Sequence, residues 1–251
     1  MENFPELRSL SIRQVIMSRG RSRSITSHRL FPEATLVVPE TELETYSHIP
    51  LERVGIPDRF QGISAVRNWI IQHFPEEIVV MLDDDITDCV CLVSLKSRRL
   101  SVEEIGAMIE NTVYCAHGAG ARLFGWQQRP DPRALMRNDP FRINKWVGGA
   151  VGVIGKEIKW DELLRCKCDI DATLQELLTN RIVWHEARFS FTQGRDKNLG
   201  GNSLFRSADR IAAERRYLQS KWKAHISFEN YRSQERVTID VPRRQAVNLD
   251  L

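Results

Sequence analysis

The sequence predicts an α/β fold, in which a mostly parallel sheet is covered by helices on both faces. Two observations support this prediction. Short, continuously apolar runs at residues 13–18, 35–38 and 78–82 are typical of buried strands. Between the last two runs, residues 63–74 carry apolar side chains at helical spacing. Apolar strands that alternate with helices indicate a parallel sheet buried on both sides.

The composition is that of a folded protein with a bias toward arginine. The 251 residues are 42% hydrophobic and 27% charged, with a net charge of +3, and 28 of the 36 basic residues are Arg. This balance excludes disorder as the dominant state. Because arginine makes planar, bidentate contacts with phosphate, the bias favours a phosphate-bearing ligand, although a GC-rich genome would produce the same bias.

The sequence predicts neither a membrane protein nor a secreted one. It contains no run of about 18 apolar residues, and its first residues lack an apolar signal core, so we expect a cytoplasmic chain. Two of its five cysteines flank Val90 and two flank Lys167. Without a secretion signal no disulfide framework is expected, and the C-x-C spacing among apolar neighbours favours buried thiols over a zinc site.

The rest of the chain continues the same pattern. We assign residues 1–205 to one domain, and residues 206–251 to a basic helical C-terminal appendage packed on it. The further expected elements are a weak helix over 26–31, a helix over 101–111 that opens with a Ser101–Glu104 capping box, strands over 122–126, 146–154 and 182–193, a Pro- and Arg-rich loop over 127–145, a helix over 171–180, a basic helix over 208–225 and a last strand over 237–241.

Polar segments follow each of the first three predicted strands, at 18–22, 39–42 and 83–85. Because ligands bind beyond the carboxyl ends of parallel strands, we expect these segments to form one site. Its strongest signal is Asp83-Asp84-Asp85, since adjacent carboxylates repel one another unless a cation offsets the repulsion. Alternation along the strand directs Asp83 and Asp85 into one cleft, where two hard oxygen ligands suit Mg²⁺ or Mn²⁺ with a substrate diphosphate. An acidic surface turn is the alternative interpretation.

With these elements in this order, the chain resembles GT-A glycosyltransferases, which hold a metal and a nucleotide-sugar diphosphate with a DxD motif. The segments SRGR, LVVPE, RN and LDDDI most resemble those of the TET-associated glycosyltransferase subgroup, over roughly residues 12–205. Members of that subgroup occur in phages and are linked with glycosylation of hydroxymethylated pyrimidines in DNA. The resemblance implies a GT-A αβα sandwich, a UDP-sugar donor, Mn²⁺ or Mg²⁺, and duplex DNA carrying 5-hydroxymethylcytosine as acceptor.

The resemblance also implies roles for individual residues. Asp83 and Asp85 would hold the metal, with His185 as a further ligand, although a structural histidine is the alternative. Gly148, Gly149, Gly200 and Gly201 would permit close backbone approach or a hinged loop, with tight packing as the alternative. The full set expected to bind the donor is Ser18, Arg19, Gly20, Arg21, Pro39, Glu40, Arg67, Asn68, Asp83, Asp84, Gly148, Gly149, Gly200 and Gly201.

A carboxylate must remove the proton of the acceptor hydroxyl. The Glu-Asp pair usual in the family is replaced here by Cys168-Asp169-Ile170-Asp171, which leaves two candidates for the base. Asp171 is preferred because the N-terminus of the predicted helix would hold it ionised, and Asp169 is second. A plain N-cap is the alternative for Asp171.

Two basic regions are candidates for contacts with DNA, because basic residues interleaved with aromatic ones suit a nucleic-acid backbone and an unstacked base. They are Arg129, Arg133, Arg137, Arg142 and Lys145 in the loop, and Arg215, Arg216, Lys221 and Lys223 in the C-terminal helix. An ordinary solvated helix face is the alternative. We expect a monomer.

Other functions remain compatible with the sequence. A glycan, lipid or protein acceptor would keep the enzyme class. A nucleotidyltransferase shares the αβα plan, but the loop SRGRSRS lacks the expected lysine. A non-catalytic nucleic-acid-binding module is the third alternative, but without a metal its three aspartates would repel the phosphates.

Overall fold

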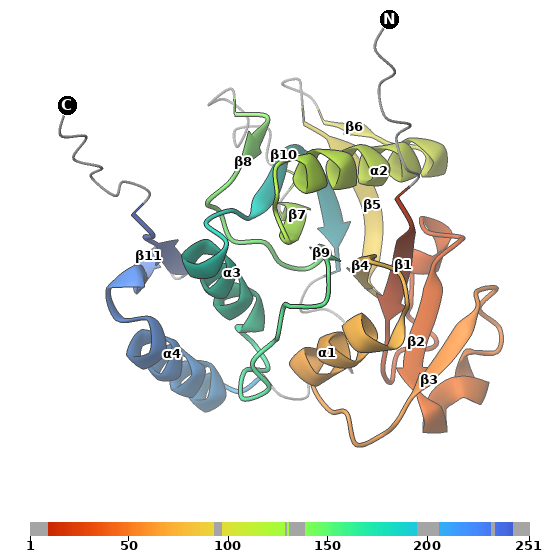
Figure 1. The fold of residues 1–251 in the computed structure, drawn as a ribbon. Coiled ribbons are helices and arrows are strands. Elements are labelled where there is room, and N and C mark those ends of the chain that lie inside the picture. The colour runs from red at the N-terminus through yellow and green to blue at the C-terminus, as the bar shows by residue number, and fades with distance from the viewer. Residues whose placement is uncertain are drawn as a thin grey trace, which may run out of the picture.

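The computed structural model describes residues 10–92, 97–128, 130, 139–194, 206–231 and 234–242. Its centre is a ten-stranded sheet with the strand order β3-β2-β1-β4-β9-β7-β10-β5-β6, and β8 pairs with β10 beside this path (Figure 1). The strands of this sheet are β1 (Ile12–Met17), β2 (Thr35–Pro39), β3 (Arg53–Ile56), β4 (Ile78–Asp83), β5 (Ile86–Cys91), β6 (Arg98–Arg99), β7 (Leu123–Gln127), β8 (Phe141–Arg142), β9 (Val151–Ile154) and β10 (Trp184–Gln193). The helices are α1 (Ile63–His73), α2 (Val102–Gly118), α3 (Cys168–Thr179) and α4 (Ala208–Trp222), with 3-10 turns η1 (Ser27–Arg29), η2 (Glu40–Tyr46) and η5 (Lys223–His225).

The first half of the sheet is parallel, as the apolar strands predict. β2 pairs with β3 and with β1, and β1 pairs with β4, all in parallel. Met17 lies opposite both Val37 and Asp83 in these ladders, so the carboxyl ends of β1, β2 and β4 reach one edge together. Beyond β4 the sheet is mixed, because β9 runs antiparallel to β4 and to β7 and β5 runs antiparallel to β10.

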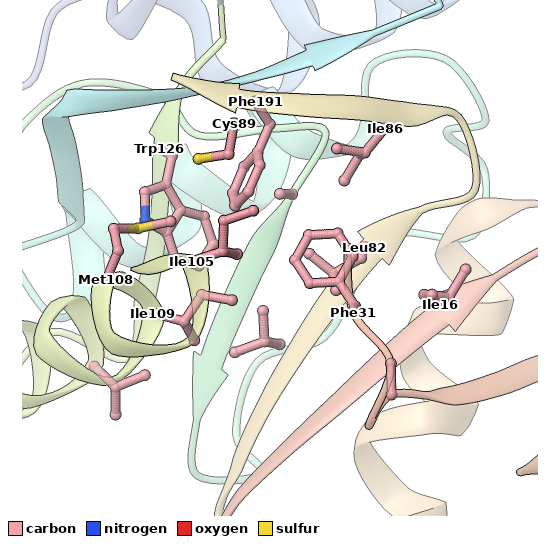
Figure 2. Close-up of a cluster of buried hydrophobic side chains, with 14 of the residues drawn as sticks. Ile16, Phe31, Leu82, Ile86, Cys89, Ile105, Met108, Ile109, Trp126 and Phe191 are labelled. Carbon is pink, nitrogen blue, oxygen red and sulfur yellow. The ribbon is translucent and has the colours of Figure 1, made fainter. Parts of the chain in front are cut away.

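Alternation along the strands separates the core into two layers. Ile16, Leu36 and Leu82 point to the face covered by α2, whereas Val15 and Met81 point to the face covered by α1 and α3. Figure 2 shows the first layer, in which Ile105, Met108 and Ile109 of α2 lie near Trp126, with Phe191 and Leu82 in the same cluster. The chain is therefore an αβα sandwich with a mostly parallel first half.

Some elements differ from the prediction. The segment 26–31 contains one 3-10 turn in place of a helix, and the strand expected over 146–154 begins only at Val151. Gly149 adopts a left-handed φ of 74°, which ends extended backbone before that strand. The capping box of Ser101 and Glu104 is present at the start of α2. Strands β3, β5, β6, β8 and β11 were not predicted.

The C-terminal segment packs on the α1 and α3 face. α4 lies beside α3 (Figure 1), and it is followed by the hairpin of β11 (Ile226–Tyr231) and β12 (Gln234–Ile239). Leu218, Ile226 and Phe228 are buried in the same cluster as α3. No helix in the described ranges is long and apolar enough to cross a membrane.

Candidate active site

A cavity of about 830 Å³ opens at the edge of the sheet where β1, β2 and β4 end. Its lining includes the ends of these three strands and the segments after them, with Arg19, Pro39 and all three aspartates at 83–85. The lining also includes residues of the segment 165–170, of the glycine loop before β9, of the end of β10 and of β12. The three polar segments predicted to meet do lie together around one cavity.

The three aspartates divide into one structural residue and two that serve the cavity. Asp84 is buried; Ser18 Oγ donates to Asp84 Oδ2 over 2.6 Å and Arg21 Nη1 donates to Asp84 Oδ1 over 2.8 Å. Asp83 and Asp85, on either side of it, are partly exposed and both line the cavity. As the strand alternation predicts, the carboxylate of Asp84 binds the β1 loop, whereas those of Asp83 and Asp85 remain partly exposed.

Asp83 has an unusual electrostatic environment. Burial raises the pKa of its carboxyl to about 7, and Asp85, Asp169 and Asp84 add to the rise while Arg67 opposes it. Gln193 Nε2 donates to Asp83 Oδ2 over 3.0 Å. A carboxyl removed from water holds its proton more tightly, and a divalent cation would displace that proton.

The loop after β1 is held by contacts on both sides of it. The Tyr46 hydroxyl lies 2.8 Å from Ser18 Oγ and accepts from the Arg21 backbone N–H over 3.0 Å. Gly20, at a φ of 66°, donates its N–H to Glu42 Oε2 over 2.6 Å. Ser18, Arg19 and Arg21 line the cavity, as expected. Tyr46 was missed because it lies in a polar 3-10 segment with no apolar pattern around it.

Arg67 is the most buried charge in the site. Its side chain is 2% exposed, forms an ion pair with Asp169 and stacks over the Trp160 ring at 4.3 Å. Burial alone would lower the pKa of the guanidinium, but Asp169, Cys168 and Asp83 raise it above its ordinary value. Asp169 is 24% exposed and lines the cavity. Arg67 is therefore paired with the carboxylate at the start of α3, and its charge also acts on Asp83 at the end of β4.

Asp171, the preferred base in the sequence, lies elsewhere. Its side chain is fully buried and accepts from Trp222 Nε1 over 2.8 Å, from Gln175 Nε2 over 2.6 Å and from Lys221 Nζ over 3.1 Å. It does not line the cavity. Nor is it an N-cap, because α3 begins three residues earlier. Asp171 fastens α4 to α3, so that of the two candidates the geometry favours Asp169.

Among the described residues of the expected donor set, Gly20, Glu40, Asn68 and Gly148 do not line the cavity. Asn68 exchanges hydrogen bonds of 2.9 and 2.8 Å with the backbone of Trp160, which supports the ring beneath Arg67. Glu40 is exposed in η2, next to Gly55. Successive side chains of a helix or a turn point in different directions. Arg67 and Pro39 therefore line the cavity, whereas their neighbours Asn68 and Glu40 do not.

The two described glycines of the expected set face side chains of the site. A Cβ on Gly148 would lie 2.9 Å from Asp169 Oδ2, and one on Gly149 would lie 2.7 Å from Gln193 Nε2. Both residues thus allow the carboxylate and the amide to approach the backbone. Gln193 also contacts Asp83, a role that its position at the end of an alternating strand did not reveal. Gly200 and Gly201 lie outside the described residues.

His185 is not placed as a metal ligand for the aspartates. It is fully buried in β10, eight residues before Gln193, or roughly 20 Å or more along the strand. Burial, with Lys145 and Arg142 nearby, lowers its pKa to about 3. The structural alternative thus fits His185. The described cysteines form no disulfide and no zinc cluster, since no group of three or more His, Cys, Asp or Glu in the described ranges could hold a metal.

The C-terminal helix uses part of its charge internally. Lys221 pairs with Asp161 and Asp171, and Arg215 donates to the Phe228 carbonyl over 3.0 Å and stacks on its ring. Arg216 and Lys223 are exposed. Lys221 and Arg215 thus make internal contacts, and the DNA-binding face of this helix stays a prediction.

Of the two described basic residues of the expected loop, Lys145 lines the cavity and Arg142 does not. Lys145 Nζ donates to Gln127 Oε1 over 3.0 Å, and burial, with Arg142 nearby, lowers its pKa to about 8. Arg142 pairs with Asp139 at 3.7 Å in β8. Arg129, Arg133 and Arg137 lie outside the described part of the chain.

Glu214 of α4 is a site residue that the sequence did not reveal. It is 4% exposed and accepts the backbone N–H groups of Arg165, Cys166 and Lys167 over 2.9, 2.9 and 3.0 Å. Lys167 in turn forms an ion pair with Glu235 of β12. α4 and the hairpin therefore hold the segment that leads to Asp169. No sequence motif predicts that a carboxylate in α4 binds three backbone N–H groups about 50 residues earlier in the chain.

Solved structures share this fold at low sequence identity. Glucosyl-3-phosphoglycerate synthase from Mycobacterium tuberculosis, in complex with Mn²⁺, UDP and glucosyl-3-phosphoglycerate, matches with a TM-score of 0.54 and 13% identity over 92% of this chain and 88% of that one. Residues 1–349 of TarS from S. aureus, in complex with UDP-GlcNAc, match with a TM-score of 0.51 and 12% identity over 86% of this chain and 68% of that one. A search of curated protein sequences found no match.

A family model identifies the chain more specifically. The model described as TET-Associated Glycosyltransferase matches residues 14–201, about three quarters of the sequence. The matched range contains the β1 loop, Arg67, the three aspartates and Asp169, while α4 and the β11–β12 hairpin lie beyond it. With a GT-A fold and this match, the chain belongs to the TET-associated glycosyltransferase family and is a glycosyltransferase.

Proposed function

We propose that this enzyme transfers a sugar from a UDP-sugar to 5-hydroxymethylcytosine in duplex DNA, with the help of Mn²⁺ or Mg²⁺. The observation that carries the proposal is the cavity in which Asp83 and Asp85 meet Arg19, Arg67 and Asp169. Its volume of about 830 Å³ is in the upper part of the range for ligand sites, which suits a nucleotide sugar together with part of an acceptor. Two neighbours of the same fold were crystallised with UDP or UDP-GlcNAc.

The residues present fit a divalent cation. Asp83 and Asp85 offer hard oxygen ligands, and burial, with the neighbouring carboxylates, raises the pKa of Asp83. No third protein ligand completes a cage among the described residues. Mg²⁺ and Mn²⁺ are commonly bound by one or two carboxylates together with substrate phosphates and water. A bound cation would stabilise the negative charge that develops on the leaving diphosphate.

The chain's own residues would perform the other steps. Arg19 lies in the cavity near the end of β1 and would bind the diphosphate, while the apolar Val37, Pro39 and Ile56 would contact the base. As the bond between the anomeric carbon and the diphosphate oxygen breaks, the acceptor hydroxyl oxygen bonds to that carbon. Asp169 would take the hydroxyl proton, and its ion pair with Arg67 would hold its carboxylate in position.

The DNA acceptor rests on the family description and on the charge of the cavity. The family is named for its association with TET, and the cavity carries more basic than acidic side chains. A base modified within duplex DNA would have to leave the stack to enter this cavity. We further propose that the enzyme acts as a monomer in the cytoplasm, where nucleotide sugars and DNA are both present.

The test has two stages. Thermal shift is measured with UDP, GDP and ADP, each with and without Mn²⁺, because a ligand that binds only the folded chain raises the melting temperature. We expect a shift with UDP that requires the metal. Transfer of sugar to duplex DNA with 5-hydroxymethylcytosine is then compared with transfer to an unmodified duplex. If UDP binds with the metal but neither duplex receives sugar, the proposed donor is retained and the proposed DNA acceptor is rejected.

A further inference from the structure

The end of β10 is bonded to the turn that carries the three aspartates. Gln193 Nε2 donates a hydrogen bond of 3.0 Å to Asp83 Oδ2, and the backbone N–H of Gly194 donates one of 3.1 Å to the Asp85 carbonyl. Gln193 also lies opposite Ile86, the first residue of β5, in the antiparallel ladder of these two strands. The last residues of β10 therefore contact both of the aspartates that line the cavity with partly exposed side chains.

Two local features bring the amide of Gln193 to Asp83. The register of β10 against β5 shifts between Thr192 and Gln193, and an irregularity of this kind changes the direction in which a side chain points. Gly149 leaves space beside the amide, because a Cβ at this glycine would lie 2.7 Å from Gln193 Nε2. The shift and the glycine thus both permit a hydrogen bond between side chains that are 110 residues apart.

The backbone of the aspartate turn is held by the segment after β1. Ser27 Oγ donates to the Asp83 carbonyl over 2.6 Å, and the backbone N–H of Thr26 donates to the Asp84 carbonyl over 2.9 Å. These bonds fix where the Asp83 side chain begins, but its carboxylate can still rotate about the side-chain torsions. Among the described residues, Gln193 is the side chain that donates a hydrogen bond to this carboxylate and restricts that rotation.

The hydrogen bond uses one oxygen of Asp83. Oδ2 accepts from Gln193, whereas Oδ1 accepts no hydrogen bond from the described residues. Carboxylates that bind metal ions are commonly oriented by hydrogen bonds from residues around them. The amide of glutamine is a neutral donor, so it orients the carboxylate without cancelling the negative charge that attracts a cation. A lysine or an arginine at this position would cancel part of that charge.

We propose that Gln193 is a positioning residue for the divalent cation, which orients the Asp83 carboxylate and leaves Oδ1 available to the ion. The inference rests on the proposed function, in which Asp83 and Asp85 bind Mn²⁺ or Mg²⁺. It adds a residue of β10 to a site whose two anionic ligands come from the junction of β4 and β5. Because Gln193 acts through Asp83, its loss changes the affinity for the ion rather than the chemical step.

The experiment measures how tightly the full chain binds Mn²⁺. Gln193→Met nearly keeps the length of the side chain and removes the amide, and Gln219→Met, at an exposed position of α4, is the matched control. Mn²⁺ is titrated in the presence of saturating UDP, with free Mn²⁺ followed by electron paramagnetic resonance, and UDP binding is also measured without metal. We expect Gln193→Met to raise the Kd of Mn²⁺ roughly tenfold to hundredfold, with metal-free binding of UDP unchanged.

Two further measurements separate positioning from a purely structural role. The Mn²⁺ concentration that gives half of the maximal rate should rise in Gln193→Met by the same factor as the Kd. The kcat at saturating Mn²⁺ should stay near the wild-type value, because a variant that loses only ground-state affinity regains its rate when the ion is in excess. A structural role would instead lower the free energy of unfolding in urea and leave the Kd of Mn²⁺ unchanged.

The outcomes distinguish this inference from the proposed function. If the wild type binds no Mn²⁺ in the presence of UDP, the proposed metal site fails, and the role of Gln193 fails with it. If wild type and Gln193→Met bind Mn²⁺ equally well, the metal site stands and the inference alone is rejected. An equal loss of affinity in Gln219→Met would also reject it, because the effect would then not depend on the hydrogen bond to Asp83.

Discussion

Asp169 and Asp171 lie two residues apart at the start of α3 but face different surroundings. Asp169 lines the cavity beside Arg67, whereas Asp171 is enclosed by Gln175, Lys221 and Trp222. We expect Asp169→Asn to lower kcat by about 10²–10⁴-fold, because an amide cannot accept the proton of the acceptor, with UDP binding preserved. Asp171→Asn should keep the kcat of the folded fraction and lower the free energy of unfolding by about 1–3 kcal/mol. Urea unfolding and steady-state kinetics of both variants distinguish the roles, and a reversal of the two results would return the base to Asp171.

Asp83 and Asp85 are expected to be required for the metal-dependent binding of the donor. Asp83→Asn and Asp85→Asn each remove one of two anionic ligands, so the thermal shift with UDP and Mn²⁺ should be lost or greatly reduced, and turnover with it. Asp209→Asn is the matched control, because Asp209 is an exposed carboxylate in the first turn of α4. A full shift in both cavity variants would mean that the metal is held elsewhere or not required.

α4 holds the segment 165–167, which lines the cavity, through Glu214. Glu214→Gln replaces one carboxylate oxygen by an amide N–H₂ that cannot accept the backbone N–H groups of residues 165–167. Leaving one or two of these donors without a partner should lower the free energy of unfolding by about 2–3 kcal/mol. Glu229→Gln, on an exposed position of β11, should change it by less than about 0.5 kcal/mol. Equal stabilities in urea unfolding would show that the Glu214 contacts do not hold the segment.

The elements differ in how far the sequence reveals them. β1, β2 and β4 are buried on both faces and carry continuous apolar runs, so their positions and the edge where they end were predicted, and the site with them. β3, β6 and β8 have two to four residues and no periodicity that a sequence can show. The surroundings of a side chain are harder to predict from the sequence. Asp171, for example, is buried by contacts with Lys221 and Trp222 of α4, about 50 residues away.

At the scale of the whole molecule, the cavity gathers charge from most of the chain. Asp83 ends a central strand, Asp169 begins α3, and the guanidinium groups come from α1, the loops and the C-terminal hairpin. Such a collection is costly to fold without its ligands, since each carboxylate removed from water must find a cation or keep a proton. The stability of the ligand-free chain should therefore depend on pH through this site.

Asp83 fixes the direction of that dependence. Burial raises its pKa from 3.8 to about 7 in the folded chain. Between about pH 4 and pH 7 the folded chain holds a proton that the unfolded chain releases, so the free energy of unfolding falls as pH rises, by at most about 1.4 kcal/mol per pH unit for this group. Asp83→Asn removes this term, and the difference between variant and wild type should grow from pH 5 to pH 7 and then level off. Because other titrating groups are common to both proteins, urea unfolding of the two at pH 5, 6, 7 and 8 isolates Asp83. Parallel curves would mean that Asp83 is ionised throughout, and that the charge of the site is balanced by the cations already present.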